Sequence, residues 1–157
     1  MDILLALLGA GSAGGFSTIG TAINAQLKTI LHSPIAAAAI NFLVGFTILT
    51  LLLGLGIFKP LNLDLLFITP WWAFFGGLLG AIFVTLSTLI VPKLGLTTTT
   101  LDVIFSQMFM SMVIDHLGWF GAIKYPINTP KILGIATLVI AVVINQLDTN
   151  YSHENVD

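Results

Sequence analysis

The sequence predicts an all-α integral membrane protein with five transmembrane helices, and two observations carry this prediction. Of the 157 residues, 57% are hydrophobic and only 8% are charged, whereas a soluble domain has about 25% charged residues. The charged side chains are therefore too few to cover a water-soluble core. The apolar residues also occur in long stretches that short polar links separate. A lipid bilayer is the solvent that fits this composition.

Five apolar stretches reach or approach the length that a membrane-spanning helix needs. A hydrocarbon core of about 30 Å, divided by a rise of ~1.5 Å per residue, requires about 20 residues. The stretches are Ile3–Leu27, Pro34–Phe58, Trp71–Val91, Thr97–Leu117 and Ile132–Leu147. We expect residues 1–147 to form one transmembrane domain and the polar tail, residues 148–157, to be disordered.

The first stretch is interpreted as a span rather than as a cleaved signal peptide. Only Asp2 precedes it, with no basic residue, and it is longer than the apolar core of about 7 to 15 residues in a signal peptide. The chain has no cysteine, which excludes disulfides and thiolate metal sites. With a net charge of −2 and no basic run, we expect no nucleic-acid partner. His153 is a single histidine in the polar tail, so we expect no metal there, and we expect no cofactor.

The fourth stretch is unusual because it carries Asp102 and Gln107 inside an apolar segment. A charged Asp at the centre of a bilayer costs about 2.5 to 3.5 kcal/mol on insertion scales, and less near the interface. At about 100° per residue the polar side chains form two opposite stripes, so we expect this helix to lie inside a bundle. The stripes are Thr98, Thr99, Asp102 and Ser106 on one side, and Thr100, Gln107 and Ser111 on the other. Asp102 is either a proton-coupling group or an interfacial carboxylate favoured by the helix dipole.

Polar residues also recur within the first two stretches. Ser17, Thr21, Asn24 and Lys28 share one helix face. Either they bond within the protein while Lys28 reaches the interface, or they line a cavity. Asn41 in the second stretch forms interhelical hydrogen bonds or contacts a ligand.

Small residues mark the faces on which we expect helices to pack closely. Gly11 with Gly15, and Gly76 with Gly80, form GxxxG pairs, and Gly45 and Gly134 lie on further small-residue faces. In membranes such residues let two helix backbones approach.

The links between the stretches add local detail. Ser33 followed by Pro34 predicts an N-cap and a Pro at the first helical position, and the short link makes the first two spans antiparallel neighbours. Trp71 and Trp72 are typical of a membrane interface. Asp115 and His116 indicate either the exit of the fourth helix into water or a proton site.

Catalytic sequence patterns are missing from the chain. It contains no GxSxG, HExxH, P-loop or Rossmann glycine motif. We therefore expect that the protein is not an enzyme.

Several stretches together resemble the YdcZ family, a branch of small proteins in the drug/metabolite transporter (DMT) superfamily. The matching segments are AINAQL at 22–27, Ser33–Pro34, INFLVG at 40–45, PWWAFFGGLLGA at 70–81, PKLG at 92–95, Gln107 and DHLGWFG at 115–121. The resemblance implies half of a ten-helix, inverted-repeat bundle in the inner membrane. Larger relatives carry ten helices in one chain, and the smallest have four and work as antiparallel dimers.

Two functions follow as hypotheses. In the first, the chain is a transporter half-unit that works as an antiparallel homodimer and moves a small polar metabolite or an organic cation. Its binding groups would gather near the bilayer midplane, and the candidates are Asn24, Asn41, Ser106, Gln107 and Thr21, with Asp102 as the proton-coupling candidate. In the second, the chain is a non-transporting assembly or accessory subunit that packs through its GxxxG faces.

Overall fold

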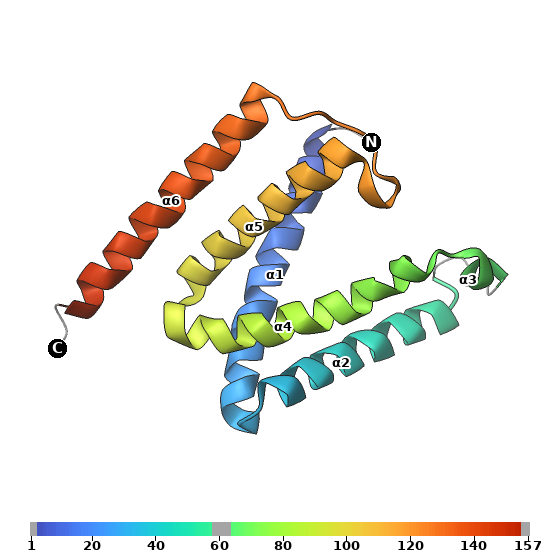
Figure 1. The fold of residues 1–157 in the computed structure, drawn as a ribbon. Helices are drawn as coiled ribbons and strands as arrows, with labels where there is room; N and C mark the ends of the chain where they lie inside the picture. The colour runs from blue at the N-terminus through green and yellow to red at the C-terminus, as the bar shows by residue number, and fades with distance from the viewer. Residues whose placement is uncertain (1–2, 58–63, 155–157) are drawn as a thin grey trace. The chain divides into compact units, whose positions relative to one another are not determined.

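The computed structural model describes residues 3–57 and 64–154, and within these ranges every regular element is a helix (Figure 1). The elements are α1 (Ile3–Leu31), α2 (Pro34–Gly54), α3 (Asp64–Ile68), η1 (Trp71–Phe74), α4 (Phe75–Leu94), α5 (Leu96–Leu117), η2 (Trp119–Gly121) and α6 (Thr129–Glu154). The chain divides into two compact units, Met1–Lys93 and Leu94–Asp157, and each unit is described by itself.

Four helices within the described ranges are long and apolar enough to cross a membrane. They are Ile3–Leu31, Pro34–Gly54, Trp71–Leu94 and Thr129–Asp148. Helix α5 has 22 residues, which is sufficient length for a span. Its four consecutive threonines, Asp102 and Gln107 lower its hydropathy, and it is not among these four candidate spans. The all-helical membrane architecture is thus confirmed, whereas the fifth span stays a prediction.

In the first unit, the predicted junction between the first two helices is confirmed. Ser33 is the N-cap of α2, its hydroxyl oxygen accepts a hydrogen bond from the Ala36 amide at 3.2 Å, and Pro34 is the first helical residue. His32 has a positive φ of 51° where the chain reverses. The two helices contact one another, as the short link predicts.

Helices α2 and α4 of the same unit lie side by side and run in opposite directions (Figure 1). The ring of Phe42 packs over Gly80, where an added Cβ would lie 3.2 Å from the ring's Cζ atom. An apolar groove adjoins this contact. It is lined by Ile35, Ala38, Ala39, Phe42, Gly77, Ala81 and Thr85.

The second unit is an antiparallel pair of long helices, and three contacts fix its register. The Thr98 hydroxyl donates a hydrogen bond to Asn145 Oδ1 at 2.7 Å. An added Cβ at Gly134 would lie 2.9 Å from Met108 Cε, and Lys131 Nζ lies 3.4 Å from Asp115 Oδ2. A glycine with a positive φ flanks α5 at each end: Gly95 (φ 81°) precedes it and Gly118 (φ 70°) follows it.

Several boundaries differ from those expected. Helix α2 ends at Gly54 rather than at Phe58, because Gly54 is a poor helix former and Gly56 has a positive φ of 68°. Helix α1 continues to Leu31, α4 continues through Pro92 to Leu94, and α6 already begins at Thr129. Helix α6 runs to Glu154, although we expected disorder from residue 148. No Gly or Pro interrupts residues 148–154, and extending an existing helix costs little once it is nucleated. Phe58, Lys59 and the tail residues 155–157 lie outside the described residues.

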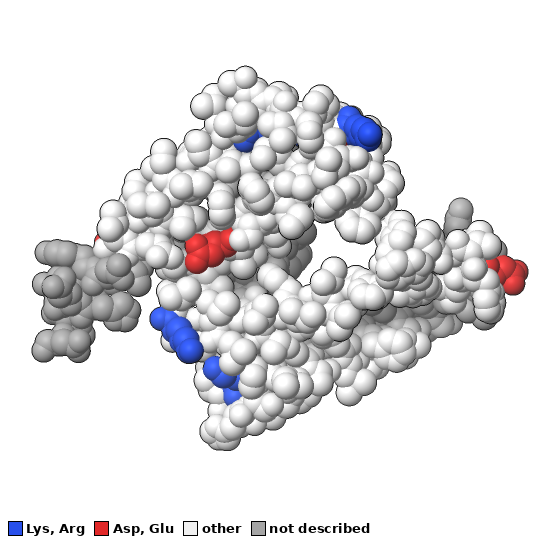
Figure 2. Space-filling view, viewed as in Figure 1, with Lys and Arg blue, Asp and Glu red and all other residues white. Residues whose placement is uncertain are grey.

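The surface of the described helices suits lipid. Large apolar side chains such as Phe16 and Phe67 are 73% and 90% exposed. Figure 2 shows Lys, Asp and Glu side chains in small, separate areas of the face in view. An apolar surface of this extent indicates a membrane environment or a protein partner.

The contact between Phe42 and Gly80 makes the stability of the first unit sensitive to a side chain at this position. We expect Gly80→Val to lower the free energy of unfolding in detergent micelles by about 1 to 3 kcal/mol, the usual cost of overpacking. Gly76→Val is the matched control on the same helix, because an added Cβ there meets no atom within 4 Å. Equal losses for the two variants, or no relief of Gly80→Val by Phe42→Ala, would show that this contact does not limit packing.

Candidate functional site

Three of the predicted site residues belong to the first unit, and they differ in their surroundings. The Thr21 hydroxyl donates a hydrogen bond to the Ser17 carbonyl at 2.9 Å. This agrees with the interpretation that the first polar stripe bonds within the protein. Asn24 is only 7% exposed. Asn41 is exposed on α2. Of the two asparagine side chains, only that of Asn24 is therefore buried.

The other three predicted residues lie on α5 in the second unit. Asp102 is half-buried, whereas Ser106 and Gln107 are exposed. Thr98 and Thr99, from the same stripe as Asp102, are 5% and 3% exposed. Thr99 bonds back to the Gly95 carbonyl, and Thr98 bonds across to α6. The pairing of α5 with α6 thus uses the start of this stripe and leaves Gln107 uncovered.

The predicted packing glycines also separate into two groups. At Gly80 and Gly134 an added Cβ would meet a side chain of a neighbouring helix. At Gly11, Gly15, Gly45 and Gly76 it would meet no atom within 4 Å among the described residues. Close packing at these four positions remains a prediction.

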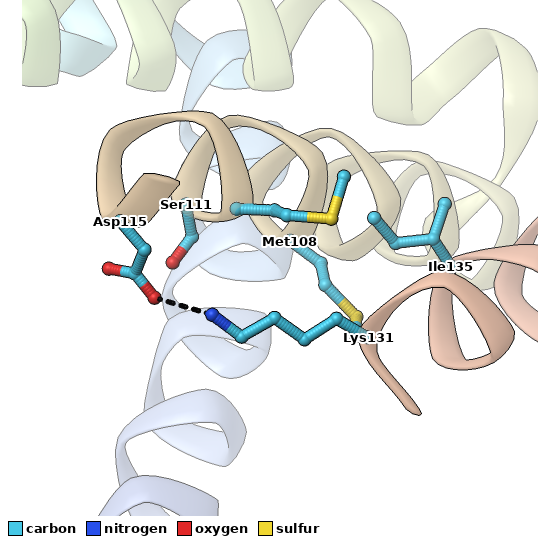
Figure 3. A pocket seen from close by; sticks show the side chains of 6 residues that line it. Met108, Ser111, Asp115, Lys131 and Ile135 are labelled. Carbon is cyan, nitrogen blue, oxygen red and sulfur yellow. Dashed lines mark hydrogen bonds and ion pairs between the residues drawn. The ribbon is translucent and has the colours of Figure 1, made fainter. Parts of the chain in front are cut away.

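A pocket with charged groups lies between α5 and α6, where α5 ends and α6 begins (Figure 3). Its cavity volume is about 140 Å³, and Asp115 and Lys131 supply its charges. The Lys131 ammonium lies 3.4 Å from the Asp115 carboxylate, and the two side chains are 29% and 35% exposed. The complete lining is Met108, Ser111, Met112, Asp115, Lys131 and Ile135.

The same two charged residues also fasten the segment that joins the helices. Lys131 Nζ donates to the Tyr125 carbonyl at 3.3 Å and lies 5.7 Å from the centre of the Tyr125 ring. The Tyr125 amide donates to the Asp115 carbonyl at 2.9 Å. His116 Nδ1 accepts a hydrogen bond from the Ile127 amide at 3.4 Å. Asp115 and His116 therefore anchor the segment that follows α5.

Sequence reasoning identified Asp115 as a helix end but did not predict this pocket. Ser111 and Asp115 are four residues apart and therefore share a helix face, a signal that was present in the sequence. Lys131 comes from the next helix after a loop, and nothing in its spacing places it opposite Asp115. The ion pair between Asp115 and Lys131 depends on the register of α5 against α6, which only the folded structure shows.

Comparisons with known proteins support the resemblance found in the sequence. Residues 5–144 match the family described as "Putative inner membrane exporter, YdcZ". Comparisons with curated proteins and with solved structures gave no match.

The hydrogen bond between Thr98 and Asn145 can be measured as a coupling energy. We expect a double-mutant cycle of Thr98→Val and Asn145→Leu to give about 0.6 kcal/mol, and at most ~1.7 kcal/mol, as for interhelical hydrogen bonds in membranes. Unfolding in mixed micelles supplies the free energies. Thr137→Val is the control partner for Asn145→Leu, because Thr137 bonds to the Leu133 carbonyl of its own helix. A coupling no larger than that of the control would contradict the proposed pairing.

Proposed function

We propose that this chain, which belongs to the YdcZ family of the DMT superfamily, is a secondary-transporter half-unit that works as a dimer. Membership in a family described as "Putative inner membrane exporter, YdcZ" supports the transport role, because the match covers nearly the whole chain. It indicates a multi-pass protein of the inner membrane with a transport role. The proposed substrate is a small polar metabolite or an organic cation.

A fifth span at α5 completes the proposed half-unit. Its 22 residues correspond to about 33 Å at ~1.5 Å per residue, which is enough to cross the hydrocarbon core. Helix α5 begins two residues after α4 ends and pairs antiparallel with α6, which is itself a candidate span. A span in this position can carry Asp102 and Gln107 if they face protein or water rather than lipid.

The dimer is proposed to be antiparallel, which would supply the inverted repeat that larger transporters encode in one chain. Orientation in the membrane follows the excess of Lys and Arg in short loops. Under the five-span topology Lys59, Lys124 and Lys131 lie on one side, and Lys28 and Lys93 lie on the other. Three against two is a small bias, which supports insertion in both orientations.

The substrate site is proposed to use Asn24, Asn41, Ser106, Gln107 and Thr21 near the bilayer midplane. Amides and hydroxyls both donate and accept hydrogen bonds, which suits a small polar molecule. Asp102, half-buried near the start of α5, is the candidate for proton coupling. Phe105 and Phe109, whose ring centres lie 6.5 Å apart, would supply aromatic contacts if the substrate is an organic cation.

One observation favours the alternative function of an accessory subunit. Gly11, Gly15, Gly45 and Gly76 have open space where a Cβ would lie, as expected for faces that another protein covers. Purified alone, an accessory subunit would be monomeric and inert towards ligands. A stable homodimer that transports a ligand would support the transporter.

Replacing the two polar groups of α5 separately tests the transport proposal. We expect Gln107→Leu to reduce uptake into proteoliposomes at least tenfold across a metabolite panel, because the leucine side chain cannot hydrogen-bond the substrate. We expect Asp102→Asn to abolish the pH dependence of uptake, since an amide does not gain or lose a proton in this range. Normal uptake by Gln107→Leu would show that the amide does not bind substrate. Unchanged pH dependence in Asp102→Asn would remove Asp102 as the coupling group.

A further inference from the structure

The ion pair in the α5–α6 pocket has the features of a pair that a ligand can open. The 3.4 Å separation of Lys131 Nζ and Asp115 Oδ2 is longer than the 2.7 to 2.9 Å typical of charge-assisted hydrogen bonds. Both side chains are about one-third exposed, so solvent reaches the pair and weakens the attraction between its charges. Exchanging this contact for contacts to a ligand therefore costs little.

Ser111 adds an uncommitted hydroxyl to the same pocket. The hydroxyls of Thr99 and Thr137 donate to carbonyls four residues earlier in their own helices, but Ser111 makes no such bond within the described helices. Figure 3 shows its hydroxyl on the side of α5 that carries the Asp115 carboxylate, towards Lys131. The pocket thus presents a carboxylate, an ammonium and a hydroxyl.

From this arrangement we infer that the pocket binds a small zwitterionic group in which a primary ammonium and an acidic group lie a few bonds apart. The ammonium pairs with Asp115, and the acidic group pairs with Lys131 and Ser111. A ligand with a single charge would pair with only one of the two residues and leave the other without an oppositely charged partner. The cavity of about 140 Å³ is smaller than the ~300 to 1,000 Å³ of drug-sized sites, which restricts the ligand to a few heavy atoms beside the Met108 and Met112 side chains.

Two sources supply this chemistry. One is a free zwitterion such as an amino acid, and the other is the ethanolamine headgroup of a phospholipid, since the last turn of α5 and the first turn of α6 are where spans meet the headgroups. The first source would name a substrate class for the transporter, and in that respect the inference rests on the proposed function. Binding to the pocket itself does not require transport.

Binding is tested with the purified full chain in phosphatidylcholine nanodiscs, because the quaternary ammonium of choline cannot donate hydrogen bonds. The probes are β-alanine and phosphoethanolamine, with ethylamine and propionate as singly charged analogues. We expect at least one zwitterion to bind saturably and at least tenfold more tightly than both analogues. Adding phosphatidylethanolamine to the nanodisc then identifies the source, because competition indicates the headgroup and undisturbed binding indicates the free zwitterion.

Three variants tie the binding to the pocket. Lys131→Gln and Asp115→Asn should each weaken zwitterion binding at least tenfold. Ser111→Ala leaves the ion pair in place and should weaken binding about fivefold, the effect expected from one lost hydrogen bond. Lys124→Gln is the matched control, since Lys124 lies in the adjoining segment but does not line the pocket. Circular dichroism and size-exclusion chromatography verify that each variant is folded.

The inference is overturned if the zwitterions bind no more tightly than ethylamine and propionate and phosphatidylethanolamine is not retained over phosphatidylcholine. It is also overturned if folded Ser111→Ala and Lys131→Gln bind as the parent chain does. The proposed function fails separately, when a zwitterion binds to the pocket but neither it nor any other metabolite of the panel is taken up into proteoliposomes.

Discussion

The structure depends on one constraint, which is that a polar group inside a bilayer needs a partner within the protein. Several hydroxyl residues of the long helices meet it locally, since Thr21, Thr47 and Thr85 each donate to the carbonyl four residues earlier. Amide and carboxylate side chains do not find hydrogen-bond partners within their own helix as simply as hydroxyls do. Asn145 therefore pairs across helices with Thr98, and Asp115 pairs with Lys131 where the helices end.

The same constraint explains why we propose α5 as the helix that carries the substrate-binding amide. One side of it packs against α6 through Met108 and Thr98. Gln107, near its middle, is left exposed by that packing. If α5 spans the membrane as proposed, an exposed amide near its middle requires water, substrate or other protein as its partner. Each of these partners is expected of a half-transporter, whereas a helix facing lipid would have no use for the amide.

Much of the fold could be predicted from the sequence because its signals are local. Apolar length predicted the four spans that the structure supports, and Ser33 with Pro34 predicted a helix start that the structure confirms. Boundaries were less predictable, since Pro92 lies within the last turn of α4 and α6 continues past residue 148. The pocket required information that spacing does not hold. Asp115 and Lys131 face each other because of the register of α5 against α6, in which Met108 packs over Gly134 and Thr98 bonds to Asn145.

The central claim is that Gln107 faces a hydrated pathway, and thiol accessibility tests it most directly. Because the chain has no cysteine, Gln107→Cys and Ile140→Cys each introduce a single thiol at mid-depth of α5 and α6. Ile140 is 59% exposed and apolar, so it serves as the lipid-facing control. The account predicts that a membrane-impermeant thiol reagent modifies the Gln107→Cys protein in proteoliposomes and spares the Ile140→Cys protein. Equal protection of both thiols would contradict it.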